Sequence, residues 1–238
     1  MKIKLLVIAL AGLFCAGAYA GVLYSDDFES GTLDSQWIYG VNNYAADGVT
    51  KVGEWFVGAD PAPITVVSTG QSGAEQGTYV LKSFGDYGYA PNYEDNKWLD
   101  TIIYIEHAIT AAEAALGTVT FDFDFKAWPI AEGGIDGVSE AGLFIKVLDQ
   151  DAGWAEVVFE EQAVTAADVN WTDGFISADI SAYEGKILQW GIHMNSQNYS
   201  PTAIATDNMQ VEVIPEPATM GLLGIAGAGL LFARRFRG

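Results

Sequence analysis

The sequence predicts an all-β protein built as a two-sheet antiparallel β-sandwich of the jelly-roll kind. Short segments in which apolar and polar residues alternate recur from about residue 22 to residue 213, and this period of two is the pattern of a half-buried strand. Glycine and asparagine clusters separate the segments, and helical periodicity is nearly absent. Many short, evenly spaced strands are typical of a sandwich or a barrel, and one buried face per strand favours two packed sheets.

The clearest strand covers Val119 to Lys126, where a valine and three phenylalanines alternate with a threonine, two aspartates and a lysine. Leu143 to Asp149 and Trp154 to Glu160 are expected to form a hairpin through a turn at Gln150 to Gly153. Ile187 to Met194 places four apolar side chains, including a tryptophan, on one face. The other expected strands are Thr50 to Val57, Ile64 to Ser68, Thr78 to Phe84, Trp98 to Ile109 and Met209 to Ile214.

Helix is expected at one place only. Ala108 to Leu116 has room for one or two helical turns, which Gly117 ends just before the clearest strand. Between the two ends of the chain there is no internal repeat, low-complexity tract or linker. We therefore expect one sandwich domain over residues 21–213, with a boundary near Ile214.

The composition indicates an acidic globular domain. Half of the 238 residues are hydrophobic and 13% are aromatic, which argues against a disordered chain. The formal net charge is −20, and only six lysines lie between the basic residues of the two ends. Such a surface repels nucleic acid and anionic lipid. The single cysteine, Cys15, lies in the N-terminal apolar run, so the mature domain has no disulfide and no thiol chemistry.

Residues 1–20 have the features of a signal peptide. Lys2 and Lys4 form a positive start, an apolar run follows, and an Ala-Tyr-Ala sequence ends at Ala20. We expect export by the general secretory route, with signal peptidase cutting between Ala20 and Gly21.

Residues 214–238 combine three features in order. A Pro-Glu-Pro element is followed by an almost uncharged run and by an arginine cluster. A helix over Ala218 to Ala233 would reach about 24 Å, a little short of the ~30 Å hydrocarbon core, and arginine snorkelling covers the difference. The positive-inside rule keeps the arginines cytoplasmic, so this transmembrane helix would hold the domain outside the inner membrane. The residues concerned are Pro215, Glu216, Pro217, Arg234, Arg235 and Arg237.

This tail resembles the PEP-CTERM sorting signal, because the same three features occur in the same order at the chain end. The resemblance implies retention in the inner membrane, recognition by an exosortase, and release to the cell surface or to the exopolysaccharide matrix of a biofilm. Four glycines in the apolar run weaken the helix by about 1 kcal/mol each relative to alanine. The alternative is an ordinary C-terminal anchor whose small residues pack against another helix.

The domain resembles the jelly-roll carbohydrate-binding modules. Its opening, Tyr24 to Gly31 followed by Trp37, and its closing segment, Ala205 to Val211, match the start and end of that family, and Asp179 to Gly191 matches the strand-turn-strand before the end. The resemblance implies the sandwich fold and an association with polysaccharide. No individual sugar-binding residue can be carried over, because those sites vary between members.

The same resemblance implies a structural calcium ion between the first and last strands. Carried over to this chain, its ligands are Asp27, Glu29 and Asp207, completed by backbone carbonyls. Calcium takes six to eight oxygen ligands, and an ion between the chain ends would clip them together. The alternative is that these carboxylates cap turns or face water.

Catalysis finds little support, and we expect the chain not to be an enzyme. No serine lies in a nucleophile-elbow motif, and His107 and His193 have no visible partner. Acidic pairs suited to glycoside hydrolysis are so numerous that they are uninformative.

Aromatic residues indicate binding instead, because sugars stack on exposed rings. Trp128, Trp154 and Trp171 lie at expected strand ends or loops and are the expected ligand contacts. The alternative is burial, the usual fate of large aromatic side chains and the expected one for Trp190.

The leading hypothesis is an exported, exosortase-sorted, non-catalytic surface or matrix protein associated with polysaccharide. A structural or adhesive sandwich that binds other proteins is the first alternative. A secreted enzyme acting on polysaccharide is the second.

Overall fold

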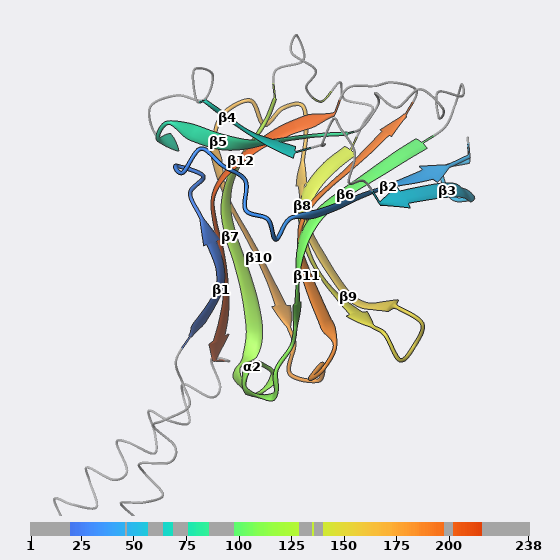
Figure 1. Ribbon diagram of the computed structural model, residues 1–238, viewed down its shortest axis with the longest axis vertical. Coiled ribbons are helices and arrows are strands. Elements are labelled where there is room, and N and C mark those ends of the chain that lie inside the picture. The colour runs from blue at the N-terminus through green and yellow to red at the C-terminus, as the bar shows by residue number, and fades with distance from the viewer. Residues whose placement is uncertain are drawn as a thin grey trace, which may run out of the picture.

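The computed structural model describes residues 20–45, 47–56, 64–68, 76–85, 98–128, 135, 140–197 and 202–215 (Figure 1). The signal helix expected before Ala20 and the tail helix expected after Pro215 both lie outside these residues. In the part of the chain that is described, no helix is long and apolar enough to cross a membrane.

The chain folds into two six-stranded antiparallel sheets that face each other, as predicted (Figure 1). The first sheet has the order β10 (Thr172–Asp179), β7 (Gly117–Ala127), β12 (Ala203–Pro215), β5 (Tyr79–Phe84) and β4 (Ile64–Ser68), with β1 (Gly21–Asp26) also paired to β12. The second sheet has the order β3 (Lys51–Phe56), β2 (Ile38–Tyr44), β6 (Trp98–Ala108), β11 (Ile187–Gln197), β8 (Glu140–Asp149) and β9 (Ala155–Val164).

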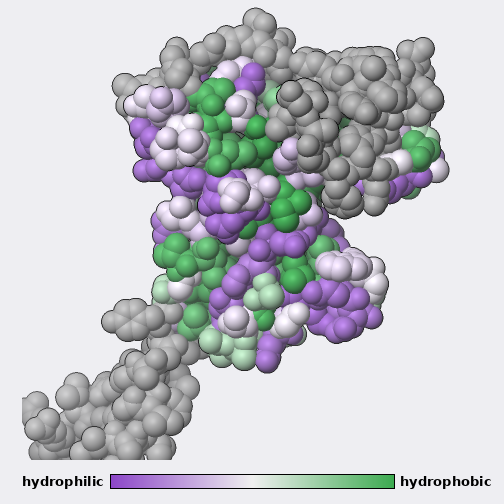
Figure 2. All heavy atoms as spheres, in the orientation of Figure 1, coloured by the Kyte–Doolittle hydropathy of each residue, from purple (hydrophilic) through white to green (hydrophobic). Residues whose placement is uncertain are grey.

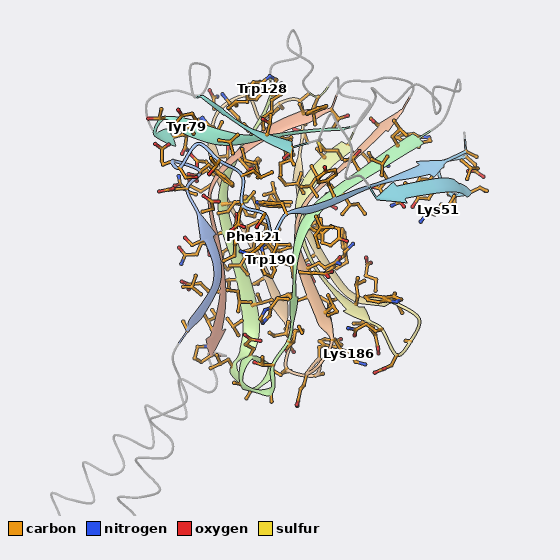
Figure 3. The ribbon with its side chains drawn as sticks, viewed as in Figure 1. Lys51, Tyr79, Phe121, Trp128, Lys186 and Trp190 are labelled. Atoms are coloured by element: carbon orange, nitrogen blue, oxygen red, sulfur yellow. The ribbon has the colours of Figure 1, made fainter. Side chains whose placement is uncertain are left out.

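The core lies between the sheets and is formed by the predicted alternation. On β7, the inward side chains of Val119, Phe121, Phe123 and Phe125 are all buried. Trp190 on β11 is buried opposite them, as expected, and Figure 3 shows Phe121 and Trp190 in the space between the sheets. Burying each such side chain stabilises the fold by about 2–3 kcal/mol.

Three strands were not among those predicted: β1, β2 and β10. Gly40 and two asparagines occupy β2, and both residue types are depleted in strands. On β10, Phe175 is 58% exposed while the small residues Gly174 and Ala178 face inward, which obscures the apolar alternation. Gly174 is needed there, because a Cβ would lie 2.1 Å from the Phe123 ring.

The expected helical turn is α2 (Ala111–Leu116). It begins with a capping box, in which Thr110 accepts from the backbone of Glu113 while the Glu113 carboxylate accepts from the backbone of Thr110. It ends at Gly117, whose φ of 100° suits glycine.

Both ends of the sandwich emerge at one pole. Gly21, at the start of β1, lies opposite Val213 on β12, and in Figure 1 β1 begins and β12 ends at the lower side of the molecule. The predicted domain end at residue 213 falls inside β12, which continues to Pro215.

Candidate functional site

The outer face of the second sheet carries rows of polar and aromatic side chains across its strands. One row runs from Glu106 on β6 through Gln189 on β11 and Lys146 on β8 to Phe159 on β9. Single polar residues between apolar ones on a strand point away from the core, so these side chains lie on the side of the sheet that faces away from the first sheet.

Part of this face forms an open hollow of about 430 Å³, here called the sheet hollow. Strand β3 and the β8–β9 hairpin project to the same side of the molecule (Figure 1), and both contribute residues to the lining of the hollow. The sheet hollow is lined by Gly40, Val41, Asn42, Lys51, Ile102, Tyr104, Glu106, Lys146, Leu148, Trp154 and Gln189.

Lys146 lies in the floor of the sheet hollow among aromatic rings. Its Nζ is 5.1 Å from the centroid of Phe144 and 5.9 Å from that of Tyr104, distances typical of a cation–π contact. Burial lowers the pKa of Lys146, although the charges of Glu156 and Asp100 act in the opposite direction. Beside it in the same row, Gln189 Nε2 donates to Glu106 Oε2 at 3.1 Å.

Asn42, which lines the hollow, is bonded to a second polar group, Asp100 on β6. Asn42 Nδ2 donates to its carboxylate at 3.2 Å. Burial raises the pKa of Asp100, while the bond from Asn42 and the nearby His193, Lys146 and Lys51 counteract that rise. Three basic side chains therefore favour the charged form of Asp100.

The two histidines have carboxylate partners, contrary to expectation. His193 Nε2 lies 2.6 Å from Glu161 Oε1, and His107 Nε2 lies 2.9 Å from Glu113 Oε2. Gly142 makes the first contact possible, because a Cβ there would lie 2.0 Å from the Glu161 oxygen. Neither pair could be predicted from the sequence. The strand register brings His193 and Glu161 together, and the α2 cap places Glu113 beside His107.

Trp154 forms one wall of the sheet hollow and is 60% exposed. It follows the predicted hairpin turn, with φ of 67° after Gly153 at 73°. The turn is fixed by Asp149 Oδ1, which accepts from the backbone nitrogens of Asp151 and Ala152. Lys186 Nζ donates to the same oxygen at 2.6 Å and so ties the turn to the β10–β11 connection.

The expected exposure of Trp128 is wrong. Its side chain is only 6% exposed and packs with Val80, Ala203 and Ala205 in a small cluster on the first sheet, where the Lys82 ammonium lies 4.3 Å from its ring centroid. Figure 3 places Trp128 at the opposite end of the sandwich from Lys186.

Trp171 is half-buried and packs against the same cluster on the first sheet as Trp128. The Lys126 ammonium lies 5.3 Å from the Trp171 ring centroid. Of the three tryptophans expected to contact a ligand, Trp154 alone therefore lines the sheet hollow.

A second candidate site gathers carboxylates between the start and the end of the domain. Asp207 on β12 is only 1% exposed, and burial raises its pKa to about 7, with the charges of Asp124, Glu29 and Asp27 adding to the rise. We call these four side chains the Asp207 cluster. It contains all three residues expected to bind calcium and adds Asp124, which the alternation of β7 had indicated only as a solvated residue.

The backbone around the Asp207 cluster is unusual. Asn208 has φ of 47° and lies where the β12 register shifts, and the buried Phe28 has φ of 53°. Left-handed conformations are uncommon for residues other than glycine. They lie in the two segments that carry Asp27, Glu29 and Asp207.

Each carboxylate of the Asp207 cluster accepts at least one hydrogen bond from the protein. As the side chains stand, no group of three or more His, Cys, Asp or Glu residues that could hold a metal ion is found in the described ranges. The donor chemistry fits calcium, but the carboxylates would have to move inward around the ion. The contacts that hold them are Glu29 N to Asp27 at 3.1 Å, Thr78 N and Tyr79 N to Glu29 at 2.6 and 2.8 Å, Asn208 N to Asp207 at 2.8 Å, and Asn208 Nδ2 to Asp124 at 2.8 Å.

The residues expected to be processed lie at the common pole. Ala20 is exposed immediately before β1, and Gly21 is the first residue of that strand. Pro215 is the last residue of β12. Glu216, Pro217 and the arginines Arg234, Arg235 and Arg237 lie outside the described residues.

Solved structures similar to the sandwich include carbohydrate-binding modules. The CBM22-1 xylan-binding domain of Xyn10C from Paenibacillus barcinonensis is 16% identical over 84% of this chain and 99% of its own length, with a TM-score of 0.47. The C-terminal family 22 module of Xyn10B from Clostridium thermocellum is 14% identical over 84% and 97%, with a TM-score of 0.43. The family 11 module from Clostridium thermocellum is 13% identical over 83% and 97%, with a TM-score of 0.39.

No curated protein sequence matches the chain. Residues 213–237 match the family model of the PEP-CTERM protein-sorting motif. This match coincides with the tail that the sequence predicted, and it implies export, membrane-anchored sorting and processing by an exosortase. The chain is thus a β-sandwich protein that carries a PEP-CTERM sorting motif at its C-terminal end.

Proposed function

We propose that this chain is an exosortase-sorted cell-surface or matrix protein whose sandwich binds polysaccharide in the sheet hollow without catalysing a reaction. The sorting motif supports the location. The sheet hollow supports the binding, and it is the observation that carries the proposal.

The sheet hollow combines the two kinds of group that a sugar polymer needs. Tyr104 and Trp154 offer aromatic faces for the apolar C–H side of a sugar ring. Asn42, Gln189 and Glu106 offer amide and carboxylate groups for hydroxyls along the ring edge. Concave sites with a few fixed polar groups among apolar ones are the usual form of ligand sites.

Affinity electrophoresis of the exported protein through gels containing different polysaccharides tests the proposal. We expect Trp154→Ala to weaken retardation by the retarding polymer by up to about 10-fold, because one stacked ring is worth about 0.5–1.5 kcal/mol. Phe175→Ala is the matched control, since Phe175 is 58% exposed but belongs to the first sheet. Equal loss in both variants would contradict a site in the sheet hollow.

Failure of every polysaccharide to bind would favour the adhesive alternative. Strand β9 is at the edge of the second sheet and exposes Val157 and Phe159 by 38% and 43%. An edge strand with apolar side chains can pair with a strand of another protein. Turnover of a polysaccharide by the purified protein would instead support the enzyme alternative.

We also propose that calcium binds the Asp207 cluster, through Asp27, Glu29 and Asp207 with Asp124 as a fourth carboxylate. The convergence of charge on the buried Asp207 supports this proposal, because a divalent cation would offset the repulsion. A bound ion would tie the segment after β1 to β12 by electrostatic attraction and direct coordination.

A further inference from the structure

The sorting motif begins inside the sandwich. The motif match covers residues 213–237, whereas β12 runs to Pro215. Val213 is fully buried, and Pro215 still lies opposite Gly117 on β7. The Pro-Glu-Pro element therefore starts at the last paired residue of the sheet, without a spacer.

The end of β12 is held along both edges. On one side it pairs with β7, through Val211 opposite Phe121 and Val213 opposite Val119. On the other side it pairs with β1, through Val213 opposite Gly21. Consequently the backbone groups of this segment are engaged within the sheet, and its two valines are buried in the core.

An enzyme that cuts a peptide bond must take the substrate backbone into its own cleft, where hydrogen bonds to the substrate replace existing ones. To bind a bond within β12, it would have to strip that segment from β7 and β1 together. The exposure of Val211 and Val213 would open the core between the sheets. Bonds on the other side of Pro215 impose no such requirement on the described strands.

We propose that the folded sandwich sets the upstream limit of tail processing, so that the bond cut lies on the C-terminal side of Pro215 and the released protein keeps all of β12. Cutting breaks one C–N bond. With water as the acceptor, the retained domain gains a carboxylate and the released tail gains an amino terminus. Removal of the signal peptide before Gly21 leaves β1 complete, so both processing events spare the strands that pair at this pole.

Mass spectrometry of the full chain after expression in cells that contain an exosortase tests the limit directly. We expect the released protein to begin at Gly21 and to end at or beyond Pro215. A C-terminus at Val213 or earlier would overturn the proposal. Release of a protein that still ends in the Arg237 region would overturn it as well, because the tail would then not be removed.

The distance between sheet and motif provides a second test. Deletion of Ile214 draws the Pro-Glu-Pro element one position into the ladder, and we expect tail release to slow at least 10-fold while the melting temperature stays within a few degrees. Insertion of Gly-Ser-Gly-Ser-Gly between Ile214 and Pro215 is the matched control. We expect it to be released at least as fast as the unaltered chain. Equal rates of tail release for the deletion and the insertion would overturn the proposal.

Discussion

At Asp207, burial and the charges of three neighbouring carboxylates favour the protonated form of the side chain. The pKa of this side chain is raised from 3.8 to about 7. Because the pKa in the folded protein exceeds the value in the unfolded chain, folding favours the protonated form. The resulting stability is fully present below pH 4 and is lost as the pH rises through 7.

We therefore expect the free energy of unfolding, measured in chelator, to fall by about 2–4 kcal/mol between pH 4 and pH 7.5. Asp207→Asn should remove most of this decrease, because the amide does not titrate. Asp173→Asn, at an exposed position on β10, is the control and should preserve it. A decrease of the same size in Asp207→Asn would show that other groups cause it.

Calcium should have its largest effect where Asp207 is ionised. At pH 8, an ion concentration a hundredfold above the dissociation constant would stabilise the folded protein by about 2.7 kcal/mol, and the melting temperature should rise accordingly. Asp207→Ala should abolish the response. A melting temperature that is the same in calcium and in chelator would contradict the calcium proposal.

The sequence predicted those residues of the Asp207 cluster that belong to short local motifs. It did not predict the residue that joins the cluster only through the strand register. Asp27, Glu29 and Asp207 came from short segments at the two ends of the domain. Asp124 looked like one more solvated residue on β7, and its link to Asn208 depends on the register shift in β12.

The same limit explains the residues of the sheet hollow. Tyr104, Lys146 and Gln189 lie on three different strands, and nothing in the sequence around each of them indicates that they are neighbours. The register of β6, β11 and β8 brings them onto one face. The predicted exposure of Trp128 was wrong for a related reason, because a residue at the end of a strand can still be buried by neighbouring strands.

Among the elements, the β8–β9 hairpin is tied to a neighbouring segment through its turn. Lys186 Nζ donates to Asp149 and to Asp151, at 2.6 and 2.8 Å. The Asp149 and Lys186 side chains are 23% and 20% exposed. The pair lowers the pKa of Asp149 and raises that of Lys186, so the interaction favours both charged forms. The hairpin carries Trp154, and its surface is largely hydrophilic in Figure 2.

Lys186→Met should therefore loosen the turn without unfolding the sandwich. A partly exposed ion pair contributes about 1 kcal/mol or less, so we expect amide hydrogen exchange at Asp151 and Ala152 to accelerate about 5-fold. Lys186→Arg, which keeps the charge, should restore most of the protection. Unchanged exchange in Lys186→Met would mean that the turn is held by its own hydrogen bonds.

Strand β11 has a glycine where no other residue fits. A Cβ at Gly191 would lie 2.0 Å from the backbone oxygen of Ile103 on β6, and backbone cannot move aside as a flexible side chain can. We expect Gly191→Ala to destabilise the protein by about 3 kcal/mol or more in denaturant unfolding. Gly21→Ala, which meets no atom within 4 Å, is the control and should change stability by less than about 0.5 kcal/mol. Similar effects of both substitutions would contradict the packing argument.

The strands that were predicted are those with regular alternation, and Ile64–Ser68 was predicted with its observed bounds. The ends of the strands were predicted less accurately. For example, β12 begins with Ala203 and not with Met209. The buried side chains of Thr206 and Asp207 interrupt the apolar pattern in that first half. Tertiary contacts with β5 and β7, which are not visible in the local sequence, continue the strand there.

For the whole molecule, the charge and the pole of attachment act together. The chain has a net charge of −20, which disfavours contact with anionic surfaces. Because Gly21 and Val213 are neighbours, the chain enters and leaves at one pole. If the tail holds this pole at the membrane, the opposite pole of the sandwich is expected to be directed away from the membrane.

The interior position of β12 also has a mechanical consequence. A pull on the chain at Pro215 acts along the strand axis, with β7 on one side and β1 on the other. The backbone bonds of both ladders are then loaded together in shear, whereas a hairpin pulled apart at its open end loses them one at a time. Resistance to force is governed by the unfolding rate. A tether through β12 should thus bear tension for longer than a tether through an edge strand of the same length.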